Sequence, residues 1–542
     1  MLRRLRGGLR GRLWPSLADV VLAAITGQLF FFQQGWMSLL GDGDTGWHIR
    51  TGEWILQHRS VPTSDLFSFA RPGAPWFAWE WLTDVLWALA HGHWGLTGVC
   101  VLAGCVILLS AMVLFRHMLW RGANVAIAFG VLLLAVGASS IHYLARPHVF
   151  TLLLMAVALW MVERDRRDTG PFLWLLIPLS VVWVNLHGGF FALPVSLAAF
   201  AAGLGIEAWL DGSQRAAKWA ASRRYAILAA ATSAASILNP YGIKLHLHIA
   251  RYVTSDWIRN AVDEFQSPSF RSESLLRFEA LLFAALLLGG WLLARKRVAD
   301  AMLVLLWGHL ALGSVRHVPI FALVSAPLVA TEVSRMWETW ANRCSPRSIW
   351  RIVWTMGADM APSFRRFSLW VFVMAAAVAF LTPSAWWPRD FPESRFPVKL
   401  VESESVRLFG ARVFTSDQWG DYLIYRGWPL QQVFVDGRSD YYGREVAEDY
   451  LALMHGREGW EKLFQKYAFS AALVPADWPL VSILDANPGW KLVRKDKTAV
   501  LYERQLEQAT VPVPAAPQIH TGQAVLPVTT RAHKTPKASA GF

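Results

Sequence analysis

The sequence contains little charge for its length and few cysteines. Asp, Glu, Lys and Arg make up 17% of its 542 residues, whereas 54% are apolar. Such a balance, with a positive mean hydropathy, argues against a soluble protein and predicts a membrane protein. The three cysteines, Cys100, Cys105 and Cys344, have neither paired nor zinc-like spacing, so no disulfide framework or zinc site is expected.

Basic residues exceed acidic ones, but they do not follow one face of a predicted element. The net charge is +13, and the Arg and Lys residues occur in short clusters between long apolar runs. This pattern is typical of loops that set membrane topology rather than of a surface that binds nucleic acid. No nucleic-acid partner is therefore expected.

About eleven apolar segments are candidates for membrane-spanning helices, which need roughly 20 residues each. They are residues 16–40, 94–115, 123–143, 149–162, 172–186, 190–210, 225–239, 277–294, 298–315, 317–333 and 368–387. Basic clusters occupy every second connection, starting with the arginines from Arg3 to Arg12, and such connections are usually cytoplasmic. The sequence thus predicts an α-helical polytopic membrane bundle, residues 1–387, with a cytoplasmic N-terminus.

Two large pieces are predicted on the extracytoplasmic side. The first is a loop over residues 41–93, whose many tryptophans suit helices at the membrane interface. The second, residues 388–505, is predicted to be a C-terminal extracytoplasmic α/β domain, while the Pro-, Ala- and Thr-rich tail over 506–542 is predicted to be disordered. The strand-like runs are Arg412 to Thr415, Gln432 to Asp436, Ala471 to Val474 and Ala499 to Tyr502, with helical patterns such as Glu445 to Tyr467.

Ionisable side chains gather at the extracytoplasmic ends of the predicted helices. Charge is costly at membrane depth, so these positions are informative: carboxylates accept protons or hold hard metal ions, and the guanidinium fork suits phosphate oxygens. The residues concerned are Asp42, Asp44, His48, Arg146, His148, Asn185, His187, Asn239, Arg316 and His317, and Glu264, in the loop after Asn239, is equally compatible with reaching the same site and with a structural role. We expect them to form one polar pocket, although each alone could also cap a helix or reach the headgroups.

The pair Asp42-Gly43-Asp44 is the sharpest local feature. One glycine lets two carboxylates turn towards one ion, or lets one ionise while the other is hydrogen-bonded; a turn with a helix N-cap is the alternative. His48 lies on the same face if a helix starts at Asp44.

Three further polar positions have a structural interpretation. Glu80, Asp84 and His91 fall at helical spacing, and the solvated face of an interfacial helix is favoured for them, except for Glu80. In the run Val433 to Arg438, Asp436 and Arg438 are expected to pair structurally.

The organisation and several motifs resemble the GT-C superfamily of membrane glycosyltransferases, which includes protein O-mannosyltransferases and aminoarabinose transferases. The motifs are Gly41-Asp42-Gly43-Asp44 through Ile55, Ala145-Arg146-Pro147-His148, Asn185-Leu186-His187-Gly188, Asn239-Pro240-Tyr241-Gly242 and Arg316-His317. The Trp-Trp-Asp signature of oligosaccharyltransferases is absent, Trp386-Trp387-Pro388 being a partial echo. Transfer of whole oligosaccharides to asparagine is therefore not expected.

The resemblance implies a glycosyltransferase of the bacterial inner membrane, with a polyprenyl-phosphate-linked sugar donor and an extracytoplasmic lipid, glycan or protein acceptor. It implies that Asp42 or Asp44 is the general base, with a divalent cation, Mg²⁺ or Mn²⁺, as an optional partner of both. His48 and Glu80 are further catalytic candidates. The candidates for substrate binding are Arg146, His148, His187, Glu264, Arg316 and His317. A transporter or flippase and a non-catalytic assembly protein are the alternatives.

Overall fold

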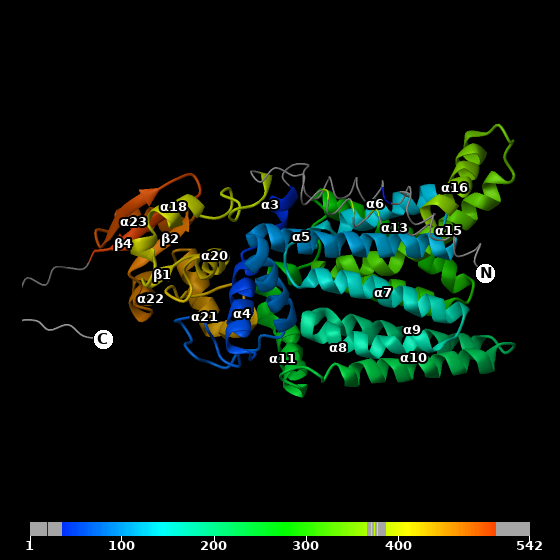
Figure 1. Cartoon of the computed structure of the whole chain (residues 1–542), viewed down its shortest axis with the longest axis horizontal. Helices are drawn as coiled ribbons and strands as arrows, with labels where there is room; N and C mark the ends of the chain where they lie inside the picture. Colours follow the sequence, from blue (N-terminus) through cyan, green and yellow to red (C-terminus); the bar gives the residue numbers. More distant parts are fainter. Residues whose placement is uncertain are drawn as a thin grey trace, which may run out of the picture.

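The computed structural model describes residues 35–365 and 386–505, together with Asp19 and the isolated positions 370, 373 and 377. Most of the predicted spans at 16–40 and 368–387, and the whole tail 506–542, lie outside the described residues. Within the described part, a bundle of long helices occupies one half of the molecule and a C-terminal domain (residues 386–505) the other (Figure 1).

The bundle helices coincide with the nine other apolar segments of the sequence. They are α5 (Trp81–Arg121), α6 (Val125–Ser139), α7 (His148–Arg167), α8 (Leu176–Leu186), α9 (Ala192–Leu210), α10 (Arg215–Ala235), α13 (Glu273–Ala294), α14 (Val298–Gly313) and α15 (Val318–Ala341). Among the described residues, five helical stretches are long and apolar enough to cross a membrane, and the stretches at Pro171–Leu186 and Val298–Gly313 are apolar but shorter. The charged ends of α7 and α10 lower their apolar content.

Shorter helices surround the end of the bundle that faces the C-terminal domain. In Figure 1, α4 (Asp44–His58) and α11 (Ile243–Thr254) run across the bundle axis at this end. Helix α5 breaks at Trp94 and Gly95, where Gly95 has a φ of 60°, so its first part can follow α4 while the rest joins the bundle. The remaining elements outside the C-terminal domain are α3 (Gly35–Leu39), α12 (Asp256–Ala261) and α16 (Ile349–Arg365), and the short 3-10 helices η2 (Ser140–His142), η3 (Pro171–Leu175), η4 (Gly188–Phe191), η5 (Asp263–Phe265) and η6 (Val315–His317).

The C-terminal domain contains one four-stranded sheet with helices packed around it. The strand order is β1-β2-β4-β3; β1 pairs parallel to β2, and the other pairs are antiparallel. Its elements are α18 (Val398–Ser403), α19 (Ser405–Leu408), β1 (Val413–Phe414), α20 (Asp417–Gly427), α21 (Ser439–Met454), α22 (Trp460–Lys466), β2 (Ala471–Pro475), α23 (Pro479–Ala486), β3 (Trp490–Lys495) and β4 (Ala499–Arg504). Three predicted strands are confirmed.

The fourth predicted strand, residues 432–436, is wrong as a sheet strand. Its backbone pairs instead with the first loop: the Val433 amide donates to the Phe67 carbonyl and the Phe69 amide donates to the Val433 carbonyl, both at 2.9 Å. A short buried apolar run has the same composition in either setting, so its pairing partner was not readable from periodicity. Strand β3, with mostly exposed side chains, was missed.

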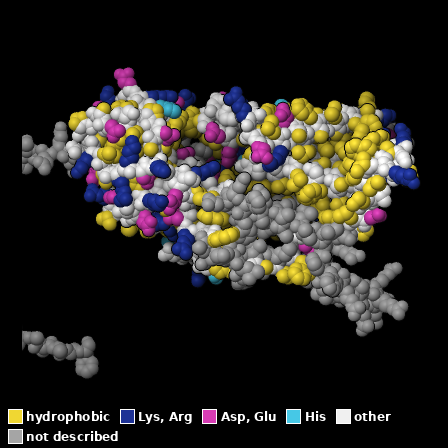
Figure 2. Space-filling view, turned by 90° about the horizontal axis from the view of Figure 1, so that it is seen from above, with side chains coloured by type: hydrophobic (Ala, Val, Ile, Leu, Met, Phe, Trp, Pro, Cys, Tyr) yellow, Lys and Arg dark blue, Asp and Glu magenta, His cyan; other side chains and the backbone are white. Residues whose placement is uncertain are grey.

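The first loop (residues 41–93) and the C-terminal domain are packed closely against each other. Helix α20 lies on α4, and a Cβ at Gly46 would come within 2.7 Å of the Asp421 carbonyl oxygen. Only glycine allows this backbone approach. Apolar side chains cover the visible flank of the bundle, whereas charged ones gather over the C-terminal domain (Figure 2). This division is expected if the bundle lies in the bilayer and the C-terminal domain lies outside it.

Candidate functional site

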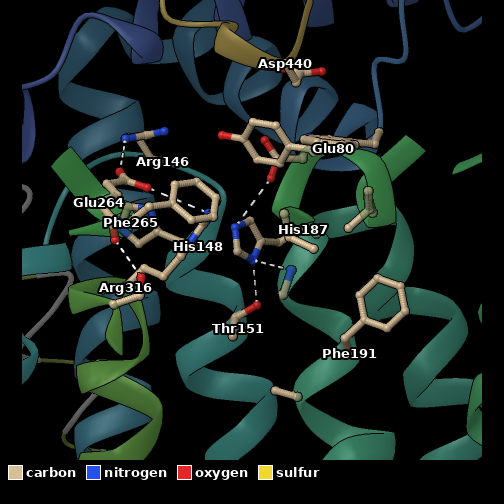
Figure 3. Close-up of a pocket in the computed structure, with 18 of the residues that line it drawn as sticks. Glu80, Arg146, His148, Thr151, His187, Phe191, Glu264, Phe265, Arg316 and Asp440 are labelled. Carbon is tan, nitrogen blue, oxygen red and sulfur yellow. Dashed lines mark hydrogen bonds and ion pairs between the residues drawn. The ribbon is translucent and has the colours of Figure 1, made fainter. Parts of the chain in front are cut away.

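A cavity of about 760 Å³ lies where the bundle, the first loop and the C-terminal domain meet. Its walls come from the ends of α7, α9, α14 and α15, from α11, and from the turn at residues 437–440. Charged side chains line one part of the wall and apolar side chains the rest (Figure 3). Residues more than 300 positions apart in sequence, such as Asp44 and Arg438, therefore line the same cavity.

Arg146 is the centre of the charged wall. Its Nη1 lies 3.0 Å from Asp42 Oδ2 and 2.8 Å from Glu264 Oε1, and its Nη2 lies 2.6 Å from Asp44 Oδ2. Arg146 lies two residues before the start of α7, Asp44 is the first residue of α4, and Glu264 lies in η5. The turns that the sequence suggested as neighbours thus converge on one guanidinium.

The environment changes the acidity of these carboxyls in opposite directions. Burial, together with the nearby Asp42 and Glu264 charges, raises the pKa of Asp44 to about 7, although Arg146 acts against it. Burial alone would also raise the pKa of Glu264, but Arg146 and Arg316 outweigh it and hold that pKa well below its usual range. The cluster therefore holds one firmly ionised carboxylate beside one that titrates near neutral pH.

Glu80 stands on the opposite wall of the cavity. Its Oε1 is 3.5 Å from His187 Nε2 and its Oε2 is 3.7 Å from His48 Nε2. Burial raises the pKa of Glu80 to about 8, with Arg146 acting against this rise. His187 in turn contacts the Thr151 hydroxyl through Nδ1 at 2.8 Å, and Figure 3 shows both histidine nitrogens engaged.

Arg316 and the remaining histidines complete the polar lining. The Arg316 guanidinium is 3.7 Å from Glu264 and stacks over Phe265 at 4.4 Å. His148 Nε2 lies 2.5 Å from the His142 carbonyl oxygen, and His317 Nδ1 lies 3.2 Å from the Leu310 carbonyl oxygen. Arg316 keeps more freedom for an anionic ligand than Arg146, which already contacts three carboxylates.

Comparison with solved structures identifies the architecture. The archaeal oligosaccharyltransferase AglB from Archaeoglobus fulgidus, a GT-C membrane glycosyltransferase solved with an inhibitory peptide and a dolichol-phosphate, superposes with a TM-score of 0.51 at 12% sequence identity. The alignment covers 92% of this chain and 74% of AglB. The chain has the GT-C fold. It is an integral membrane protein.

A second GT-C structure is similar but more distant. ArnT from Cupriavidus metallidurans, bound to undecaprenyl phosphate, has a TM-score of 0.45 and 12% identity, over 90% of this chain and 97% of ArnT. No family model and no curated protein sequence matches the chain. The fold shared with AglB confirms the resemblance seen in the sequence at the level of architecture.

Most site candidates line the cavity of this GT-C fold, and four do not. Asp42 does not line the cavity but contacts Arg146 at 3.0 Å. His48 does not line it either; it is buried and lies 3.7 Å from Glu80. Asn185 is structural: its Oδ1 accepts from Trp81 Nε1 at 2.7 Å. Asn239 is structural as well, since its side chain bonds to the backbone of the turn after α10.

The favoured interpretation of Asp84 and His91 as a solvated face is wrong. Asp84 is fully buried, with Oδ1 at 2.5 Å from His48 Nδ1. His91 contacts Glu53 at 3.4 Å and the Tyr425 hydroxyl at 3.1 Å, and so faces the C-terminal domain. A helical stripe of polar residues has the same spacing whether it faces water or other polar groups, so the pattern did not separate the two cases.

Sequence reasoning missed several cavity residues. They are His142, Thr151, His246, Tyr252, Gly437 and Asp440. Gly437 has a definite reason for being glycine, because a Cβ there would overlap the Asp44 carboxylate. Asp436 and Arg438 beside it pair as expected, at 2.6 Å, and Asp65 of the first loop joins them at 2.8 Å.

The carboxylates as arranged do not fit a divalent cation held between Asp42 and Asp44. The Arg146 guanidinium occupies the position between them. Among the residues that the structure describes, no group of three or more His, Cys, Asp or Glu is placed to hold a metal ion. The positive charge of this wall is therefore supplied by arginine.

Proposed function

We propose that the chain transfers a sugar from a polyprenyl-phosphate-linked donor to an acceptor on the extracytoplasmic side of the plasma membrane. The observation that carries this proposal is the composition of one cavity, whose lining includes the arginines Arg146 and Arg316, the carboxyls Asp44 and Glu80, whose pKa values are raised, and an apolar wall. The arginines suit a phosphate, the carboxyls suit a sugar hydroxyl, and the apolar wall suits a prenyl chain.

Arg316 is assigned to the donor phosphate. As the sugar–phosphate bond breaks, negative charge grows on the phosphate oxygens, and a fixed guanidinium in a dry site stabilises that charge. Arg316 is held by one distant carboxylate and one aromatic ring, which fixes its position without saturating its donors. Arg146 adds positive charge to the same wall, held in place by Asp42, Asp44 and Glu264.

Glu80 is assigned as the general base for the acceptor hydroxyl. Asp44 also lines the cavity, but its Oδ2 is committed to Arg146, whereas Glu80 contacts two histidines and the Gly188 amide and no arginine among the described residues. As the acceptor oxygen bonds to the anomeric carbon, its proton passes to Glu80 and the phosphate leaves with the bonding electron pair. Asp42 and Asp44 then serve to hold Arg146, rather than to remove the proton.

The apolar wall is assigned to the lipid. Phe191 and Val195 near the start of α9, Leu310 of α14 and Ile320 of α15 line the cavity, and Val195 is 40% exposed at the bundle surface. A prenyl chain could therefore lie against the bundle while its phosphate reaches Arg316. The basic clusters between helices, which favour the cytoplasm, support an extracytoplasmic position for this end.

Release of free polyprenyl phosphate tests the assignment. The purified full chain, in detergent micelles, is incubated with a detergent extract of the whole cell envelope, which supplies the lipid-linked donor together with lipid, glycan and protein acceptors, and polyprenyl phosphate is measured by mass spectrometry. We expect wild-type protein to release it and Glu80→Gln to release at least about 100-fold less. A flippase breaks no bond, so absence of release by the folded wild-type protein would contradict the transferase and favour transport.

A further inference from the structure

A row of three ionisable side chains, Asp84, His48 and Glu80, lies at the wall of the cavity. Asp84 Oδ1 of α5 and His48 Nδ1 of α4 are 2.5 Å apart, and their side chains are 0% and 1% exposed. On the other side of the ring, His48 Nε2 lies 3.7 Å from Glu80 Oε2. His48 therefore links Asp84 to Glu80, and both carboxyl residues line the cavity.

The Asp84–His48 contact must contain a proton. Nitrogen and oxygen atoms approach to 2.5 Å only when one of them donates, and the ring then presents its other nitrogen to Glu80. Gly52 keeps α4 against α5, because a Cβ there would overlap the Asp84 carbonyl oxygen. The Glu80 carboxyl turns about a soft terminal torsion, which can close the 3.7 Å gap to His48.

Glu80 needs somewhere to place a proton before it can act as a base. Burial raises the pKa of Glu80 to about 8, so Glu80 is mostly protonated at neutral pH. Burial also lowers the pKa of His48, which disfavours a charged imidazolium in this position. A double shift avoids that charge: as Nε2 receives a proton from Glu80, Nδ1 passes its own proton to Asp84.

We propose that Asp84 is a positioning residue that, through His48, takes up the proton which Glu80 holds at rest. The inference rests on the proposed function, in which Glu80 removes the proton of the acceptor hydroxyl. The shift breaks the Glu80 O–H and His48 Nδ1–H bonds and forms His48 Nε2–H and Asp84 O–H bonds. Glu80 becomes a carboxylate, and His48 stays neutral throughout.

Other charged or titratable groups act on the same row. Around Glu80 and His48 they are Arg146, Asp44, His187 and Asp440, and Tyr241 faces Asp84. None of these is close enough to Asp84 to form a hydrogen bond with it among the described residues, and Asp84 Oδ2 has no hydrogen-bond partner there. His48 is therefore the route by which Asp84 acts.

The pH dependence of the rate distinguishes a relay from a structural role. In wild type, the rate is expected to change less than about threefold between pH 6 and 8, because Glu80 need not ionise into water. In Asp84→Asn, Glu80 must ionise alone, so the rate should rise about tenfold per pH unit up to a pH of about 8. A structural loss would lower the rate equally at every pH, and parallel profiles would overturn the proposal.

A measurement without turnover separates this inference from the proposed function. Infrared spectra of the full chain in lipid nanodiscs at pH 6 should contain a protonated-carboxyl band that Glu80→Gln removes. That band should shift in both Asp84→Asn and His48→Gln, and not in Glu53→Gln, which alters the other carboxyl–histidine pair of this loop at 3.4 Å.

The two measurements fail in different ways. If the band is missing, or is unmoved by Asp84→Asn and His48→Gln, the relay is wrong whatever the protein catalyses. If the band shifts but wild-type protein transfers no sugar, the proposed function is wrong and the relay stands as a property of the site.

Discussion

Two clusters of charged side chains lie at opposite ends of the bundle and are built differently. At the end away from the C-terminal domain, arginines alternate with three carboxylates, Glu163, Asp300 and Glu332, each of which contacts at least two arginines. The N–O distances are 2.5 Å for Arg121–Glu163, 2.9 Å for Arg166–Glu163, 2.8 Å for Arg166–Asp300, 2.6 Å for Arg297–Asp300 and 2.5 Å for Arg297–Glu332. Charges in such a cluster compensate one another, so the loss of one member leaves buried charge uncompensated.

The cluster at the cavity is not balanced in this way. Asp44 keeps one buried oxygen without a hydrogen-bond partner in the described part of the chain, and Glu80 contacts no arginine. Both carboxyls have pKa values raised towards or above neutrality. The difference teaches that carboxylates paired with arginines maintain the structure. Carboxyls that lack such a pairing beside a cavity can exchange protons.

Glu80→Gln, at the cavity, is expected to reduce the transfer rate more than any substitution at the other end of the bundle. Loss of a general base is expected to reduce the transfer rate by about 10²- to 10⁴-fold, with little change in melting temperature. The rate is measured as polyprenyl phosphate released per folded molecule. Glu53→Gln is the matched control from the same loop and should retain activity; equal losses in both variants would contradict the assignment.

Asp300→Ala should produce the opposite result. Removing this carboxylate leaves Arg166 with Glu163 alone and Arg297 with Glu332 alone, and the loss of these charge-assisted contacts is expected to cost about 2 kcal/mol of stability. Denaturation in detergent measures the loss, and the rate per folded molecule should remain near that of wild type. A selective loss of rate with normal stability would mean that this end takes part in the chemistry.

Arg316→Gln should have a smaller effect, confined to anion binding. Removing one charge-assisted contact is expected to weaken binding of undecaprenyl phosphate about tenfold, or roughly 1.4 kcal/mol. Affinity is measured by titrating the lipid into the purified chain. Arg335→Gln, at the far end, is the control and should bind normally.

Stability should fall slightly as pH rises through neutrality. A carboxyl whose pKa is higher in the folded than in the unfolded state stabilises the fold at low pH and loses that contribution as pH rises to the folded pKa. For Asp44 this window runs from 3.8 to about 7, and for Glu80 from 4.5 to about 8. The melting temperature should fall by roughly 2 °C or more over pH 5 to 8. Asp44→Asn should flatten this fall, whereas Asp300→Asn should not.

Much of the bundle was predictable because its signal is local. Each apolar run such as 190–210 or 277–294 must bury or face lipid along its length, so it marks a helix without any knowledge of its neighbours. The pairing of residues 432–436 was not predictable, because it depends on a loop more than 360 residues earlier in the chain. Strand β3 has no apolar alternation to reveal it.

The site was predictable in part for a related reason. Alternation of helices fixes which turns share one end of a bundle, and Asp44, Arg146 and Glu264 meet as that alternation implies. It does not specify which polar face of an interfacial helix turns inward, so Asp84 was taken for a solvated residue. That choice depends on Gly52 and His48, whose contact with α5 appears only in three dimensions.

The most direct test of the account is the lipid bound to an inactive protein. Native mass spectrometry of purified Glu80→Gln should find an intact polyprenyl-phosphate-linked sugar, because binding by Arg316 and the apolar wall persists while the bond is not broken. Wild-type protein should instead retain polyprenyl phosphate without the sugar. Finding only ordinary phospholipid on both proteins would contradict the central claim that this cavity is a lipid-phosphate-sugar site.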